Sequence, residues 1–137
     1  MEELRILGRG ILGRCPNCGQ RHIFRRWFHM LERCPNCGLF FEREEGYWTG
    51  AVAINTIVTE LIFAIVLVAG VIWTWPDIPI TPILIIAVVI NATFPLFFYP
   101  YSKTIWVAID LILHPLEERE QHEVVTLRRV RNHGDVG

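Results

Sequence analysis

The chain of 137 residues contains four cysteines, and their spacing is its strongest chemical signal. They form two Cys-x-x-Cys pairs, Cys15 with Cys18 and Cys34 with Cys37, with 15 residues between the pairs. This spacing is typical of a four-cysteine zinc site, in which two turns each present two thiolates to one tetrahedral metal ion. No cysteine remains for a disulfide, so we expect thiols in a reducing compartment.

Each pair lies in the same six-residue repeat, Arg-Cys-Pro-Asn-Cys-Gly, which begins at Arg14 and again at Arg33. The prolines preset the backbone of a turn. Gly19 and Gly38 can take the left-handed conformation that lets backbone N–H groups point at the sulfurs. The two arginines flank the ligands, so we expect them to offset the negative charge that four thiolates leave on a dication.

The metal itself is less strongly indicated than the site. A tetrahedral site of four sulfurs suits iron as well as zinc. We favour zinc, because the loop between the two pairs is shorter than expected for a rubredoxin, the iron protein with similar turns. A thioredoxin-like dithiol would need a strand–helix–strand context, which the sequence does not show. We expect the metal to contribute to folding, because a segment of about fifty residues has too small a core to fold securely alone.

The charged residues are segregated along the chain. Between Gly46 and Tyr101 only Glu60 and Asp77 are charged, and all 13 Lys and Arg lie outside, eight before and five after this stretch. A run of about fifty nearly uncharged residues excludes an ordinary soluble domain and most soluble enzymes. The net charge of -1, and the small basic excess in residues 1–49, argue against nucleic acid as a partner.

Two apolar segments, residues 51–75 and 80–99, are each long enough to cross a bilayer as a helix. We expect helices because no alternating barrel pattern appears. Prolines in residues 76–82 predict a tight outer loop at 76–79, so the spans form a hairpin within residues 50–101. The basic residues lie on the side of the two termini, which by the positive-inside rule places both termini in the cytoplasm.

The segment after the hairpin, residues 102–137, has an apolar start and a charged tail. Pro95 and Pro100 are expected to kink or end the second span. Because Lys103 and Asp110 would be costly to bury in lipid, we expect residues 102–113 to form a separate helix along the cytoplasmic surface. Residues 117–131 are predicted to form a short helix or strand, and the last residues to be disordered.

Polar residues gather at one level of the hairpin. Glu60 lies near the middle of the first span, and Asn55, Thr56 and Thr59 share its helical face. A charged carboxylate there is costly, so we expect it to be protonated or hydrogen-bonded. Asn91 and Thr93 lie near the same level of the second span and are candidate partners. We favour polar contacts between these helices, or with a partner's helix, over a proton path, because two spans seldom enclose a path alone.

The segment between the cysteine pairs mixes basic and aromatic residues, with Arg25 and Arg26 next to Trp27 and Phe28. We expect a β-hairpin that packs the ribbon or touches the membrane, with its arginines near anionic lipid headgroups. A nucleic-acid surface is the alternative. No nucleophile–base pair and no glycine-rich phosphate loop stands out, so we expect neither an enzyme nor a small-molecule substrate.

Several of these segments together resemble a known bacterial family. The two cysteine repeats are followed by Phe-Glu-Arg-Glu-Glu-Gly-Tyr at residues 41–47 and by Gly-Ala at residues 50–51, where the first span begins. This combination is similar to domain-of-unknown-function family 983. The resemblance implies a small inner-membrane protein with an N-terminal zinc ribbon, two spans and no established activity. For some members it implies a position near respiratory-oxidase assembly.

These patterns predict a membrane protein of three parts: a small-β zinc ribbon in the cytoplasm at residues 1–49, a transmembrane helical hairpin at 50–101, and an interfacial helix with a charged tail at 102–137. We expect a non-enzymatic adaptor or assembly factor of the bacterial inner membrane. Its ribbon would dock a cytoplasmic partner, and its hairpin a membrane protein or a second copy of the chain. The alternatives are a rubredoxin-like iron protein that transfers electrons, and a protein that senses or handles metal.

Overall fold

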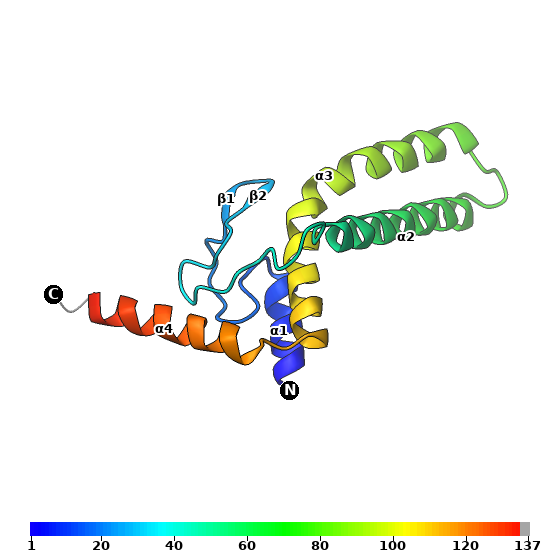
Figure 1. The fold of residues 1–137 in the computed structure, drawn as a ribbon. Helices are drawn as coiled ribbons and strands as arrows, with labels where there is room; N and C mark the ends of the chain where they lie inside the picture. Colours follow the sequence, from blue (N-terminus) through cyan, green and yellow to red (C-terminus); the bar gives the residue numbers. More distant parts are fainter. Residues whose placement is uncertain (135–137) are drawn as a thin grey trace.

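The computed structural model describes residues 1–134, and Figure 1 shows how their elements are arranged. The chain begins with α1 (Glu2–Ile11), a helix that was not among the elements expected above. α1 lies beside the last part of α3 (Ile80–Leu113), and Gly10 permits this close approach. A Cβ at Gly10 would lie 2.6 Å from the Cβ of Ala108. Because Gly10 has no side chain, its carbonyl can accept a hydrogen bond from Thr104 Oγ1 at 2.7 Å.

The ribbon contains a small antiparallel sheet of two strands, β1 (Phe24–Arg26) and β2 (His29–Met30). Phe24 pairs with Met30, and the turn between the strands carries Trp27 and Phe28. An isolated bridge joins Arg33 to Phe40 on either side of the second cysteine pair. The expectation of small β structure in this segment is therefore confirmed.

Two long apolar helices, α2 (Thr49–Thr74) and α3, lie side by side and run in opposite directions (Figure 1). A loop of residues 75–79 joins them. Each is long and apolar enough to cross a membrane, and the 26 residues of α2 extend over about 39 Å. Only 6% of the apolar window in α2 and 11% of that in α3 are buried by protein, so both helices expose apolar surface that a soluble protein would cover.

The separate interfacial helix that the sequence suggested at residues 102–113 is not observed, because α3 continues as one helix to Leu113. Figure 1 shows that α3 changes direction in its yellow part, between the portion beside α2 and the portion beside α1. Pro95 and Pro100 lie inside the helix, and each removes a helical amide donor. The prolines therefore bend the helix without ending it.

Side chains from other elements satisfy the backbone at this bend. Pro100 has no N–H, so the carbonyl of Leu96, four residues earlier, lacks its helical donor. The indole N–H of Trp27 donates to that carbonyl at 3.2 Å. Asn55 Nδ2 on α2 donates to the neighbouring carbonyl of Pro95 at 3.3 Å. A substitute donor, here Trp27, is one way in which membrane helices tolerate proline.

The two charged residues that argued against a continuous helix have hydrogen-bond partners within the protein. Lys103 Nζ donates to the carbonyl of Phe28 at 3.0 Å. Asp110 accepts hydrogen bonds from Arg43 Nη1 at 3.0 Å and from the Tyr47 hydroxyl at 2.9 Å. Contacts with the ribbon therefore offset the cost of burying polar groups in this part of α3.

The predicted tail segment is helical, as α4 (Glu118–Gly134). It packs against the ribbon, where Leu127 lies over Gly38 and Glu123 pairs with Arg33. Residues 135–137 lie outside the described part of the chain, so the expectation for the end of the tail is not addressed by the structure.

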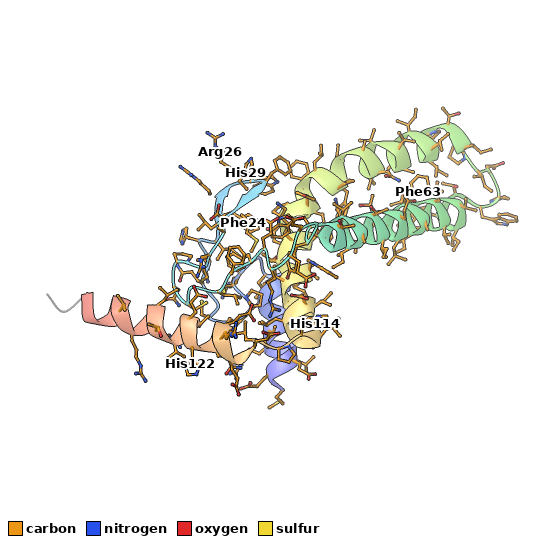
Figure 2. All side chains as sticks on the ribbon, in the orientation of Figure 1. Phe24, Arg26, His29, Phe63, His114 and His122 are labelled. Carbon is orange, nitrogen blue, oxygen red and sulfur yellow. The ribbon has the colours of Figure 1, made fainter. Side chains whose placement is uncertain are left out.

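The buried core lies between the ribbon and the last part of α3. Cysteines of the ribbon, together with Ile23 and Phe41, pack in one cluster with Val107 and Leu111 of α3. Figure 2 shows side chains crowded in this region and projecting freely from the far parts of α2 and α3. The core thus joins residues that are far apart in the sequence, and it lies next to the cysteine cluster.

Candidate metal centre

The two cysteine repeats form turns with the same backbone hydrogen bonds. In the first turn the N–H of Gly19 donates to the carbonyl of Cys15 at 2.8 Å, and in the second Gly38 donates to Cys34 at 2.9 Å. Both glycines are left-handed, with φ of +81° and +77°, as the repeat predicted. The repeat in sequence is therefore a repeat in backbone geometry.

The four cysteine sulfurs lie within 4.8 Å of one another. Cys15 Sγ lies 3.8 Å from Cys37 Sγ, and Cys18 Sγ lies 3.5 Å from Cys34 Sγ. Four sulfurs at about 2.3 Å from a zinc ion would lie about 3.8 Å apart at the corners of a tetrahedron. All four cysteines are free thiols, so the cluster is able to hold one metal ion.

The four cysteine thiols cannot ionise independently of one another, because they are close together and largely buried. Cys15, Cys34 and Cys37 are buried, and Cys18 is half-buried. Contacts with the sulfurs of Cys34 and Cys37, together with burial, raise the pKa of Cys15. Contact with Cys15 lowers the pKa of Cys34. A dication would allow all four to be thiolates, and its binding would release protons and weaken as the pH falls.

An arginine that the sequence did not single out contacts the first turn. Arg9 Nη1 on α1 donates to the carbonyl of Asn17 at 2.7 Å. Arg33, which was expected to offset the thiolate charge, also pairs with Glu123 on α4. The signal for Arg9 was the amphipathic pattern of residues 2–11, which indicates a helix with one face on the protein.

A polar cluster around Arg43 fastens the ribbon to α3 and α4. Arg43 pairs with Asp110 at 3.0 Å and with Glu120 at 2.6 Å, and Tyr47 donates to Asp110. Its guanidinium lowers the pKa of Glu120, and burial together with the Asp110 contact raises the pKa of Tyr47. Segment 41–47, on which the family resemblance partly rests, thus links both helices. The signal for Asp110 was its isolation as an acid in an apolar segment.

The predicted intramembrane patch is assembled only in part. Asn55 contacts α3 through the carbonyl of Pro95, as described above. Thr59 is buried and donates to the carbonyl of Asn55 at 2.7 Å, and Thr56 donates to Val52 at 3.0 Å, each within α2. Of these hydroxyl and amide groups, only Asn55 reaches across to the second helix. The interpretation of this patch as a contact between helices therefore holds for one residue.

Glu60 and Asn91 do not meet in the structure. Glu60 is exposed, and within residues 1–134 it has no hydrogen-bond or ion-pair partner. Asn91 is half-buried on α3, and the proposed pairing of the two is wrong within one chain. The reason is helical geometry. Asn55 and Thr59, four residues apart, occupy the stripe of α2 that faces α3, and Glu60 is turned about 100° away from it.

A family model described as protein of unknown function (DUF983) matches residues 24–110. The match includes the second cysteine pair, segment 41–47, all of α2 and most of α3, and it begins after the first cysteine pair. No curated protein and no solved structure matches the chain. Because the matched residues make up more than half of the sequence, the chain belongs to the DUF983 family of proteins of unknown function.

Proposed function

We propose that this protein is a non-enzymatic adaptor of the bacterial inner membrane. Its zinc-loaded ribbon docks a cytoplasmic partner, and its helical hairpin docks a partner within the membrane. The observation that carries the proposal is the shared core, in which the cysteines pack against Val107 and Leu111 of α3. Metal bound to these cysteines stabilises the ribbon in one orientation relative to the spans.

Polar contacts support this orientation at three separate points. Thr104 donates to the carbonyl of Gly10 in α1. Lys103 donates to the turn of the β-hairpin, and Arg43 pairs with Asp110. A domain that was merely tethered to the membrane would need none of these contacts. An adaptor that aligns two partners requires them, because docking depends on the relative position of its two surfaces.

The exposed carboxyl of Glu60 supports a docking role for the hairpin. An ionisable side chain inside hydrocarbon is costly without a hydrogen-bond partner, and none is found within residues 1–134. A donor on the helix of a partner protein, or of a second copy, would satisfy it. The basic residues that precede and follow the hairpin in the sequence support a cytoplasmic location for both termini.

We assign zinc to the site because closed, buried sites of four thiolates are typical of structural zinc. The same tetrahedron accommodates iron, which would make the ribbon an electron carrier. Elemental analysis of natively expressed protein, with its visible spectrum, separates the two. About one zinc per chain and no colour is the expected result. One iron per chain with a visible charge-transfer band would overturn the non-redox adaptor and favour electron transfer.

Co-purification of the full chain in mild detergent tests docking by the ribbon. Cys34→Ser removes a ligand, whereas Asn17→Ser changes a non-ligand residue in the first turn and serves as the control. Partners of the ribbon should be lost from Cys34→Ser and retained by Asn17→Ser. If Cys34→Ser retains every partner, the ribbon does not dock them. Rapid loss of metal from the wild type to a chelator would favour metal handling instead.

A further inference from the structure

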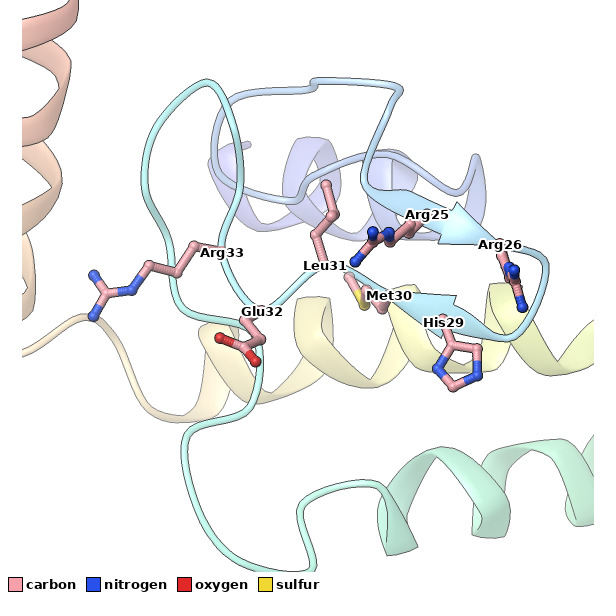
Figure 3. Close-up of a pocket in the computed structure, with 7 residues that line it drawn as sticks. All are labelled: Arg25, Arg26, His29, Met30, Leu31, Glu32 and Arg33. Carbon is pink, nitrogen blue, oxygen red and sulfur yellow. The ribbon is translucent and has the colours of Figure 1, made fainter.

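Two cavities meet at Arg26 in the β-hairpin of the ribbon. The first, of about 630 Å³, is polar and is drawn in Figure 3; its lining consists of Arg25, Arg26, His29, Met30, Leu31, Glu32 and Arg33. The second, of about 330 Å³, lies between the hairpin and α3; its lining consists of Leu12, Gly13, Phe24, Arg26, Trp27, Pro100 and Tyr101. Arg26 therefore belongs to the lining of both a basic cavity and a mainly apolar one.

The first cavity has uncompensated positive charge. Arg25 and Arg26 are exposed, and neither has an ion-pair partner within residues 1–134. Arg33 is different, because it pairs with Glu123 on α4. Glu32 is the acidic residue in the lining, and it forms no ion pair with these arginines. Figure 3 shows Arg26 and His29 near the end of the hairpin and Arg25 nearer the middle of the cavity. The arrangement suits an anion with several acceptor oxygens, such as a phosphate.

The second cavity lies at the point along α3 where its exposed apolar part ends and its buried part begins. Leu96 and Phe97 are 58% and 65% exposed, whereas Pro100 is buried. Trp27 is held at this level by its hydrogen bond to the Leu96 carbonyl and by an edge-on contact with the Phe97 ring. A tryptophan that is half exposed and anchored beside a membrane span is typical of the interface between hydrocarbon and headgroups. The arginines next to Trp27 are thus placed at the level of lipid phosphates.

We propose that the hairpin binds one anionic phospholipid of the cytoplasmic leaflet. Its phosphate contacts Arg25 and Arg26, and the beginning of an acyl chain enters the apolar cavity beside Trp27 and Pro100. A basic cavity next to an apolar one favours a lipid, which has both a charged headgroup and an acyl chain. A free anion would use only the first cavity. The arrangement also favours a lipid over RNA, because the two turn aromatics are engaged, Trp27 with Phe97 and Phe28 with Tyr99. This inference rests on the membrane placement proposed above.

Native mass spectrometry of the full, metal-loaded chain in detergent tests the site. Phosphatidylglycerol, phosphatidylcholine, inorganic phosphate and a short RNA oligonucleotide are titrated separately. The first phosphatidylglycerol should bind at least about tenfold more tightly than phosphatidylcholine, because charge-assisted contacts distinguish the headgroups. Inorganic phosphate should bind far more weakly than the lipid. Equal binding of both lipids, phosphate binding as tight as the lipid, or preferential RNA binding would each overturn the proposal.

Three variants separate charge from folding. The pair Arg25→Ala and Arg26→Ala should weaken phosphatidylglycerol binding at least about tenfold and leave phosphatidylcholine binding unchanged. The pair Arg119→Ala and Arg128→Ala removes the same charge from exposed positions on α4 and should bind like the wild type. Glu32→Gln should bind phosphatidylglycerol more tightly, a gain that a damaged fold would not produce. Unchanged affinity in the hairpin pair, or an equal loss in the α4 pair, contradicts the assignment. A result of either kind leaves docking of protein partners untouched, so it is distinguishable from failure of the adaptor proposal.

Discussion

At the scale of single residues, the cysteine cluster depends on local chain geometry. Each Cys-Pro-Asn-Cys-Gly turn closes on itself through a glycine in the left-handed region, so five consecutive residues suffice to present two sulfurs. The two turns then need only to face each other. Core residues such as Ile23 and Phe41, both fully buried, hold them in that position.

Cys34→Ser should abolish metal binding and unfold the ribbon. Structural zinc contributes about 10–16 kcal/mol in zinc-finger peptides, which equals or exceeds the stability of most domains. Metal content and far-ultraviolet circular dichroism of the purified chain provide the measurement, with Asn17→Ser as the control that retains all four ligands. A Cys34→Ser protein that still bound one metal per chain with a native spectrum would contradict the site.

At the scale of elements, the packing of α1 on α3 depends on one of two glycines in α1. A Cβ at Gly10 would lie 2.6 Å from Ala108 Cβ and 2.9 Å from the Thr104 carbonyl oxygen. A Cβ at Gly8 would have no heavy atom within 4 Å apart from those of its own residue, its chain neighbours and the local helix backbone. The two positions therefore separate the effect of packing from that of helix propensity.

Gly8→Ala should stabilise the protein by up to about 1 kcal/mol, because alanine favours helix over glycine. Gly10→Ala has the same propensity gain but should be less stable than Gly8→Ala by about 1–3 kcal/mol, because α1 must shift away from α3. Urea unfolding of the two variants in detergent measures the difference. Equal stabilities would show that α1 does not pack as described.

The docking of α4 should weaken in acid. The hydrogen bond and charge of Arg43 lower the pKa of Glu120 below its ordinary value of 4.5. A carboxyl with a lowered folded-state pKa contributes stability above its unfolded value, and this contribution is lost as the pH falls through the lowered value. The amide resonances of α4 in detergent micelles, followed from about pH 6 to pH 3, should therefore report its release from the ribbon.

Glu120→Gln is the reference for this titration. The variant cannot titrate at this position. Any acid-dependent change in α4 that the wild type shows and the variant does not is therefore due to Glu120. Metal release at low pH affects both proteins and cancels in the comparison. Identical pH profiles for the two proteins would mean that the Arg43–Glu120 pair does not dock α4.

At the scale of the whole molecule, the exposed apolar surfaces of α2 and α3 predict a defined topology. The loop of residues 75–79 carries no basic residue. All 13 basic residues come before or after the hairpin in the sequence, at the end where the two termini lie. Alkaline phosphatase inserted after Ile78 should be active in bacterial cells, because the enzyme requires the oxidising periplasm. The same enzyme fused to the C-terminus should be inactive, and activity there would reverse the proposed orientation.

We expect the association of the hairpin with a membrane partner, or with a second copy, to depend on Glu60. Glu60→Leu removes the polar group from the exposed face of α2, whereas Glu60→Gln keeps a hydrogen-bonding side chain of the same length. We expect chemical cross-links to the membrane partner, or to a second copy, to be lost in Glu60→Leu and kept in Glu60→Gln. Cross-links that persist in Glu60→Leu would show that another face of the hairpin associates.

The sequence alone was sufficient to predict the cysteine cluster, the small sheet and the two long apolar helices. Each of these features follows from short-range patterns. The cysteine turns are set by the repeated sequence Arg-Cys-Pro-Asn-Cys-Gly. An uninterrupted apolar segment is helical because it must satisfy its own backbone hydrogen bonds in hydrocarbon. Four sulfurs by themselves do not distinguish zinc from iron, because both metals accept a tetrahedral site of this kind.

Tertiary structure decided the features that depend on residues far apart in the chain. α3 continues past Pro100 because Trp27 supplies a donor to the carbonyl that the proline leaves free, 69 residues away. Lys103 and Asp110 are acceptable in that helix because groups of the ribbon form a hydrogen bond and an ion pair with them. Glu60 has no such partner in the described part of the chain, because α2 turns it away from α3. The cost of a proline or a charge is set by the groups that surround it, and these are defined only when distant segments meet.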